Sequence, residues 1–284
     1  MVQMNLHKII ISLSLAFLIL VIYIIYLIGS GYSFVGGPAN TTWQTVINLL
    51  YLILLGFIPP ILWLIFWIRE DPHPEPKKEI LTVFFAGIAV VALAIFLENY
   101  FFKSNQLFRE VFSYSPALFQ IVNLLGFAFI EEICKMLAVI FTAFRSKYFD
   151  EPVDAMIYMV TAAMGFAALE NILFIADSLQ YGVNQTILVS AFRFINAVLL
   201  HASTAILIGA GFAFSYFHHE RRWKELGGAV VFSTLLHAAY NFFIINNTDK
   251  IAGIPGQLIA TGLVLLGAVA GLFLFEKARR IINI

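Results

Sequence analysis

Eight long apolar segments constrain the fold of this chain more than any other feature. A helix needs roughly 20 apolar residues to cross the ~30 Å hydrocarbon core of a bilayer. Segments of about that length or longer lie at residues 9–28, 45–68, 80–102, 117–144, 153–176, 187–217, 227–245 and 257–275. The loops between them are too short to fold as separate domains. We therefore expect an all-α, polytopic membrane helix bundle of about eight transmembrane helices.

The composition agrees with a chain surrounded by the lipid bilayer. Hydrophobic residues make up 61% of the sequence and charged residues 12%, whereas a soluble domain carries about 25% charged residues. So few charges cannot cover a water-facing surface. The formal net charge is zero, so nothing indicates a nucleic-acid partner. A single cysteine, Cys134, excludes an internal disulfide framework.

The first two segments each raise a local question. Residues 9–28 are longer than the apolar core of a signal peptide, about 7–15 residues, so we expect an uncleaved first helix. Gly29, Ser30 and Gly31 follow it, and cleavage there stays an alternative. In the second segment, Pro59 and Pro60 predict a kink, with the freed carbonyl groups satisfied by neighbouring helices.

The loop charges predict the orientation, because Lys and Arg accumulate on the cytoplasmic side. With the N-terminus inside, twelve basic residues are cytoplasmic: Lys8, Arg69, Lys77, Lys78, Arg145, Lys147, Arg221, Arg222, Lys224, Lys277, Arg279 and Arg280. Three are external, namely Lys103, Arg109 and Lys250, and Lys135 and Arg193 lie within segments. We expect a multi-pass protein of the cell membrane with both termini cytoplasmic.

Ionisable residues gather in four consecutive segments. A charge at the bilayer centre costs at least ~2.5–3.5 kcal/mol on insertion scales, so such residues are rare and usually functional. The cluster comprises Glu131, Glu132, Lys135, Glu170, Asn171, Arg193, His201, His237 and Asn241. The first three segments contain almost none, apart from Glu98 near an external end. Arg193 lies close to the start of its segment, so two interpretations stay open: it snorkels outward, or it belongs to the cluster.

The spacing inside the cluster predicts which side chains share a helix face. His237 and Asn241 are i and i+4, and so are Glu131 and Lys135, with the acid placed in the favourable direction for an ion pair. That pairing would leave Glu132, about 100° away around the helix, free to act.

Three kinds of chemistry fit such a set of residues. Two histidines and a carboxylate can bind catalytic zinc and leave a position for water, with a further Glu as the base. Alternatively, a Glu and a His activate water without a metal, with His237 and Asn241 donating to an oxyanion. The third possibility is a proton- or ion-coupled transporter or channel using the same charges. No inverted repeat and no matching pair of broken helices supports it.

Four motifs occur in order within these segments. They are E-E-x-x-K at 131–135, F-x-x-x-E-N at 166–171, L-H-A-S-T-A around His201, and H-x-x-x-N at 237–241. Together they resemble the PrsW family of intramembrane proteases, which looks related to the CAAX prenyl endopeptidase and Abi group. That group typically has E-E-x-x-x-R and F-x-x-x-H. Here Lys135 comes one position earlier, and Glu170 stands where that His would be, so the PrsW branch fits better.

From the segment lengths and the loop charges we expect residues 1–284 to form a single membrane domain, with accessory helices in 1–110, catalytic helices in 115–245, and a last helix with a cytoplasmic tail in 255–284. The resemblance covers roughly residues 115–245 and implies an activity. The activity would be an intramembrane endopeptidase that cuts a single-pass, membrane-anchored protein near its extracytoplasmic side. In PrsW itself that substrate is an anti-sigma factor.

We expect the catalytic residues to be Glu131, Glu132, Lys135, Glu170, His201, His237 and Asn241. Zinc, or another divalent metal, would be held by Glu170, His201 and His237, leaving the fourth position for water. Glu132 would be the general base or a fourth protein contact, with Lys135 helping Glu131 to orient it. Asn241 would donate to the developing oxyanion.

Overall fold

The structure, a computed structural model, describes residues 42–112, 115–181, 183–217, 222–246, 250–251 and 254–281. The first predicted segment, at 9–28, lies outside these residues. The helices are α2 (Thr42–Glu70), α3 (Lys77–Phe112), α4 (Pro116–Thr142), α5 (Pro152–Ser178), α6 (Val183–Ile195), α7 (Ala197–Phe217), α8 (Arg222–Ile245) and α9 (Gly256–Ile281). Two 3-10 turns, Ala143–Arg145 and Leu179–Tyr181, and an antiparallel pair of two-residue strands, β1 (Lys250–Ile251) and β2 (Ile254–Pro255), complete the described elements.

The predicted helical membrane bundle is confirmed. Six stretches of the described chain are long and apolar enough to cross a membrane. α4 has a similar length but carries Glu131, Glu132 and Lys135. The predicted segment 187–217 corresponds to α6 and α7, which are separated at Asn196. The interruption is slight, because the Asn196 N–H still donates to the Phe192 carbonyl and its own carbonyl accepts from Leu200.

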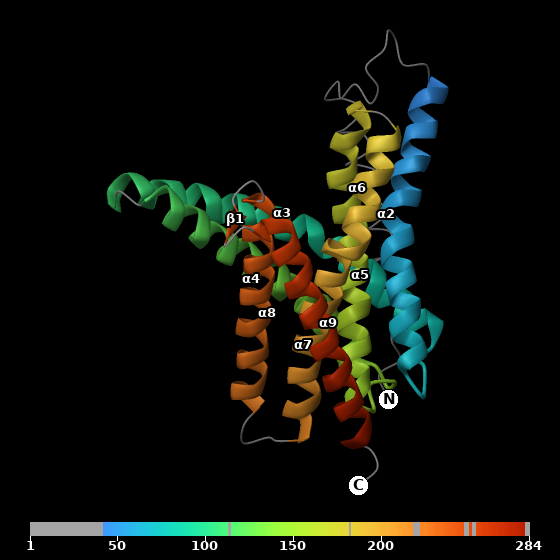
Figure 1. Cartoon of the computed structure of the whole chain (residues 1–284). Coiled ribbons are helices and arrows are strands. Elements are labelled where there is room, and N and C mark those ends of the chain that lie inside the picture. Colours follow the sequence, from blue (N-terminus) through green and yellow to red (C-terminus); the bar gives the residue numbers. More distant parts are fainter. Residues whose placement is uncertain are drawn as a thin grey trace.

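α5 and α7 form the centre of the bundle. α5 packs against α2, α3 and α7, and α7 packs in addition against α8 and α9. Figure 1 shows α5 and α7 among the other helices, whereas α3 and α4 run side by side and reach out to the left. Large apolar side chains on the outer helices are exposed, for example Leu54, Phe96 and Leu266. This inversion of a soluble protein's pattern fits a bundle whose outer face meets lipid.

Glycines allow α3 and α5 to approach closely. A Cβ atom built on Gly165 would collide with the Phe84 carbonyl oxygen, and one built on Gly87 would collide with the Ala162 carbonyl oxygen. Neither backbone atom can move aside as a flexible side chain could. Small residues at helix contacts are typical of membrane bundles, where close backbone packing replaces the hydrophobic effect.

The two prolines of α2 leave the carbonyl groups of Leu55 and Gly56, four residues earlier, without a helical N–H donor. Neighbouring helices supply the donors, as predicted. The Ser190 hydroxyl on α6 donates to the Leu55 carbonyl (3.1 Å), and the Asn171 side-chain amide on α5 donates to the Gly56 carbonyl (3.3 Å).

The ends of the described helices separate by charge. The last residues of α2 and α9 and the first residues of α3, α5 and α8 lie at one end of the bundle, toward the bottom of Figure 1. Basic residues there include Arg69, Lys77, Lys78, Lys147, Lys224, Lys277, Arg279 and Arg280. We refer to this as the basic end.

Candidate active site

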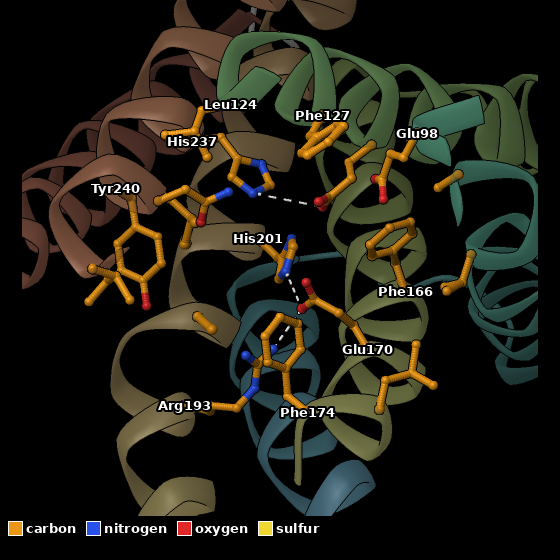
Figure 2. A pocket seen from close by; sticks show the side chains of 18 of the residues that line it. Glu98, Leu124, Phe127, Phe166, Glu170, Phe174, Arg193, His201, His237 and Tyr240 are labelled. Carbon is orange, nitrogen blue, oxygen red and sulfur yellow. Dashed lines mark hydrogen bonds and ion pairs between the residues drawn. The ribbon is translucent and has the colours of Figure 1, made fainter. Parts of the chain in front are cut away.

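A cavity of about 400 Å³ lies between α3, α4, α5, α6, α7 and α8. Most of its wall is apolar, from residues such as Phe127, Phe166 and Leu200. The polar groups on its wall are Glu98, Glu131, Glu170, Arg193, His201, His237, Tyr240 and Asn241. Helices far apart in the sequence therefore bring most of the predicted site residues to one space. Figure 2 shows His201 between His237 and Glu170 within this wall.

Lys135 on α4 is wholly buried, and it pairs with Glu132 as well as with the predicted Glu131. Its ammonium group lies 2.9 Å from Glu132 Oε1 and 3.7 Å from Glu131 Oε2. Glu132 is therefore the closer partner, and its side chain is 0% exposed. Lys135 and Glu132 stand behind the cavity wall, whereas Glu131 is part of it. A buried ammonium needs a close carboxylate to offset its desolvation, and Glu132 fills that role here.

His237 on α8 is held between the two glutamates of α4. Its Nδ1 lies 2.7 Å from Glu132 Oε1, and its Nε2 lies 3.7 Å from Glu131 Oε2. An ionised carboxylate only accepts hydrogen bonds, so Nδ1 carries the proton and donates it to Glu132. The lone pair of Nε2 then faces Glu131 and the cavity. A carboxylate that orients a histidine in this way is the usual support of a metal-binding imidazole.

His201 on α7 connects α4 with α5. Its Nδ1 lies 2.8 Å from Lys135 Nζ, and its Nε2 lies 2.9 Å from Glu170 Oε2. The ammonium group can only donate, so Nδ1 accepts, and Nε2 donates to Glu170. His237 also lies near, with ring centroids 5.3 Å apart.

Arg193 on α6 fixes Glu170 from the other side, which decides between the two interpretations of this arginine. Its Nη2 donates to Glu170 Oε2 (2.7 Å), and its Nε donates to Asn171 Oδ1 (2.7 Å). Arg193 thus belongs to the cluster and does not extend outward. The same Asn171 holds the Gly56 carbonyl freed by Pro60. A continuous polar chain therefore runs from the proline turn of α2 to His201.

Three side chains on the cavity wall could hold a metal ion. Ligand atoms of Glu131, His201 and His237 all lie within 4.8 Å of one another, and all three residues are buried. Glu131 Oε2 is buried without a hydrogen-bond partner, so it could serve as a metal ligand. The donor set of two imidazoles and one carboxylate suits catalytic zinc. To bind through Nε2, His201 would carry its proton on Nδ1, taken from Lys135, and the Nε2 proton would leave to water, so that Glu170 stays ionised.

This set differs from the predicted one in its carboxylate. Glu131 stands in this candidate set where we expected Glu170, whose Oε2 is bound by Arg193 and His201. Asn241 lines the cavity one turn from His237, as its spacing predicted. Three polar cavity residues were not assigned to the site from the sequence, Arg193, Glu98 and Tyr240. The available signal for Glu98 was its isolation as an acid in an otherwise apolar segment.

The comparisons with known proteins agree with the motifs. The profile of the "PrsW family intramembrane metalloprotease" matches residues 75–272. Protease PrsW of Clostridioides difficile (strain 630) is 31% identical over 205 residues, covering 68% of this chain and 79% of the relative. Protease PrsW of Bacillus subtilis (strain 168) is 27% identical over 195 residues, covering 68% and 82%. The counterpart in Geobacillus kaustophilus (strain HTA426) is 28% identical, covering 68% and 80%.

No solved structure matches this chain at a significant level. The matched region nevertheless includes α3 to α8, and so every helix of the cavity wall. A membrane bundle, a buried cluster with the donor set of a metalloprotease, and relatives that are proteases by name all agree. This chain is therefore a member of the PrsW family and an intramembrane endopeptidase of the metalloprotease class.

Proposed function

We propose that this protein hydrolyses a peptide bond of a single-pass membrane protein on the extracytoplasmic side of the bilayer midplane, an anti-sigma-factor-like substrate being the expectation from the family resemblance. The observation that carries the proposal is the cavity with Glu131, His201 and His237 on its wall. Glu170 and His237 lie in the halves of α5 and α8 farther from the basic end. If that end is cytoplasmic, as the loop charges predict, the cavity is displaced toward the opposite leaflet.

The residues on the wall divide into two roles. Glu131, His201 and His237 would hold a divalent metal, and zinc suits this donor set. When bound, the metal acts as a Lewis acid on the attacking water and on the scissile carbonyl group. Glu132 and Lys135 lie behind the wall and fix the orientation of the two histidines. Glu132 is therefore proposed as a positioning residue and not as the base.

Glu170 is the carboxylate we propose as general base. Its side chain is 18% exposed, and it lines the cavity, whereas Glu132 is 0% exposed. Arg193 and His201 both bind Oε2, so Oε1 stays open to water. Glu170 would take a proton from the attacking water and return it to the leaving amine. Asn241, also on the wall, would donate a hydrogen bond to the oxygen that becomes negative.

The apolar part of the wall indicates how the substrate lies. Phe127, Phe166, Leu173 and Ile244 surround the polar groups. An unfolded stretch of a transmembrane segment brings apolar side chains that fit this wall, and its peptide carbonyls meet the polar side chains. A substrate that is helical across the bilayer must unwind locally, because helical carbonyl groups are shielded by their own hydrogen bonds.

The test is cleavage by purified protein in detergent, where no ion gradient exists. A reporter with a single transmembrane segment should be cut, and Glu170→Gln should slow cleavage by about 10²–10⁴-fold, the usual contribution of a general base. Because Glu170 is not among the proposed ligands, this variant should keep its metal in elemental analysis. Glu276→Gln, on an exposed part of α9, is the matched control and should cleave normally.

Two results would contradict the proposal. Full activity of Glu170→Gln would remove the assigned base. Undiminished cleavage after exhaustive chelation, with no metal detected, would instead support the metal-free Glu/His mechanism on the same residues.

A further inference from the structure

A second acidic cluster lies at the basic end of the bundle, outside the catalytic cavity. Glu75 belongs to the α2–α3 loop, Asp150 lies just before α5, and Asp154 lies in the first turn of α5. Carboxylate oxygens of these three residues lie within 4.8 Å of one another. None of them lines the catalytic cavity. Segments about 75 positions apart in the chain thus bring three like charges together, which is unfavourable unless something neutralises them.

The helix N-terminus engages only one of these oxygens. Asp154 Oδ2 accepts the backbone N–H groups of Asp150 (2.9 Å) and Glu151 (2.6 Å), as in a capping box. These backbone bonds do not use Asp154 Oδ1, and the Asp154 side chain also interacts with the Glu75 carboxyl group. Because Asp154 is only 1% exposed, water cannot readily solvate this carboxylate, and its charge needs a partner inside the protein.

Two further oxygens belonging to this loop and to α5 are buried and form no hydrogen bond of good geometry, although the Tyr158 hydroxyl interacts with the Glu75 carboxyl group. They are the hydroxyl of Tyr158, a wholly buried residue, and Asp71 Oδ2, in a residue that is 4% exposed. Tyr158 follows Asp154 by one helical turn and so shares its face of α5, and the charges of Glu75 and Asp154 both act on its hydroxyl. The charge of Asp71 acts on both Glu75 and Asp154. The Tyr158 hydroxyl and the Asp71 carboxylate thus interact with Glu75 and Asp154.

The protein supplies few positive charges to this cluster. Within the described part of the chain, no lysine or arginine forms an ion pair with Glu75, Asp150 or Asp154. His73, the nearest basic side chain of the loop, lies 3.0 Å from Glu151 and is 72% exposed. Arg279 acts on Asp71 only at longer range. Burial and the neighbouring Asp154 carboxylate raise the pKa of Glu75 to about 8.

We propose that Glu75, Asp150 and Asp154, with the buried oxygens of Asp71 and Tyr158, form a binding site for a hard divalent cation, Ca²⁺ or Mg²⁺. Carboxylate and neutral oxygen ligands without nitrogen or sulfur are the set that these ions prefer. The exposed side chain of Asp150 leaves room for water to complete the coordination. This donor set differs from the imidazole-containing set in the catalytic cavity, so the two sites select different ions.

A cation here would tie the α2–α3 loop to the start of α5. The helices α2 and α5 also meet farther along, where the Asn171 side chain of α5 donates to the Gly56 carbonyl of α2. The cation would therefore stabilise the same helix pair that holds Glu170 in place. Binding to the folded state alone raises the melting temperature as the ion concentration rises.

The test uses the full chain in detergent with His201→Ala and His237→Ala, so that the catalytic metal does not contribute. After chelation and removal of the chelator, Ca²⁺ and Mg²⁺ are titrated separately, and Tm is measured. We expect a saturable rise in Tm with at least one of the two ions. Adding Glu75→Gln and Asp150→Asn should abolish that rise, while Asp154 is kept because it caps α5. Adding Glu276→Gln instead should leave the rise unchanged.

Terbium luminescence gives a second measurement that does not depend on the stability of the acidic variants. Tb³⁺ binds oxygen sites, and an adjacent tyrosine sensitises its emission. Emission should be displaced by Ca²⁺ or Mg²⁺ and should fall in Tyr158→Phe, which keeps the ring. No Tm response to either ion, an equal response in the Glu75→Gln/Asp150→Asn variant, or unchanged emission in Tyr158→Phe would each overturn the proposal.

Discussion

At the scale of single residues, the site depends on which atom each buried group faces. Glu131 and Glu132 are adjacent on α4, yet Glu131 lines the cavity and Glu132 lies behind it against Lys135 and His237. The same chemical group thus has two different environments one residue apart. Both carry a buried oxygen without a partner. Only the oxygen of Glu131 lies among the possible metal ligands.

This difference predicts distinct effects of two matched substitutions. Glu131→Gln should lose the metal and nearly all activity, because an amide oxygen is a far weaker zinc ligand than a carboxylate. Glu132→Gln should keep a metal site but weaken metal affinity or activity by about 10–100-fold, the usual cost of losing a partner that orients a ligand. Metal content and cleavage rate, measured on the same preparations, separate the two. A Glu132→Gln protein without metal beside a fully loaded Glu131→Gln protein would reverse the assignment.

At the scale of helices, the prolines of α2 take part in the site as well as in the fold. Pro60 frees the Gly56 carbonyl, Asn171 binds it, and Asn171 also accepts from Arg193, which holds Glu170. Ser190 binds the Leu55 carbonyl freed by Pro59 in the same way, but it is not connected to Glu170 through the bonds described. The two carbonyl groups freed by the prolines therefore accept hydrogen bonds from two different side chains. One of them, Asn171, is also bonded to Arg193 at the site, and the other, Ser190, is not.

The pair of asparagine and serine gives a matched comparison. Asn171→Ala and Ser190→Ala should each destabilise the protein by about 0.6–1.7 kcal/mol, the range of side-chain hydrogen bonds between membrane helices. Only Asn171→Ala should also reduce kcat, because Arg193 loses an anchor. Adding Pro60→Ala should recover part of the stability of Asn171→Ala by restoring a helical donor for Gly56, but not its kcat. Equal activity of the two single variants would mean that Asn171 acts only in packing.

Close contact of α3 with α5 leads to a prediction about glycine. A side chain on Gly165 must displace the backbone of α3 at Phe84. We expect Gly165→Val to destabilise the bundle by about 3 kcal/mol or more, at the upper end of overpacking effects. The control is Gly228→Ala on α8, where a Cβ meets nothing within 4 Å, and where loss of a helical glycine should be neutral or slightly stabilising. Thermal unfolding in detergent measures both. A Gly165→Val protein as stable as the wild type would show that α3 and α5 do not touch here.

At the scale of the whole molecule, the basic end defines the proposed orientation. Lys147, in the turn between α4 and α5, is exposed at this end, and Gln185, at the start of α6, lies at the other. The native Cys134 is 0% exposed, so it should react little and can stay in place. The orientation can therefore be tested with one added cysteine at a time.

In intact cells, a membrane-impermeant thiol reagent should label Gln185→Cys. It should label Lys147→Cys only after the membrane is opened, because positive loops stay in the cytoplasm. The opposite pattern would invert the orientation and move the proposed cleavage site to the cytoplasmic leaflet.

The sequence by itself determined the class of fold and the set of reactive residues. Long apolar segments allow only helices in lipid, because every backbone polar group must be satisfied within the segment. Charges in such segments are too costly to be incidental, and that cost alone points to Glu131, Glu170, His201 and His237. The loss of backbone donors at Pro59 and Pro60 also follows from the sequence alone, and so does the need for donors from other helices.

Only the tertiary structure decided the partners. On one helix, Glu131 and Glu132 differ by about 100°, and Lys135 can reach either of them, so spacing alone could not choose between them. Which glutamate pairs with Lys135 and which faces the cavity depends on where α7 and α8 place His201 and His237. It also depends on the hydrogen bond from Arg193 to Glu170. The contact of Glu75 with Asp150 and Asp154 likewise exists only because the α2–α3 loop packs against the start of α5. Contacts between segments far apart in the chain follow from helix packing, which depends on side-chain shape and carries no short-range signal in the sequence.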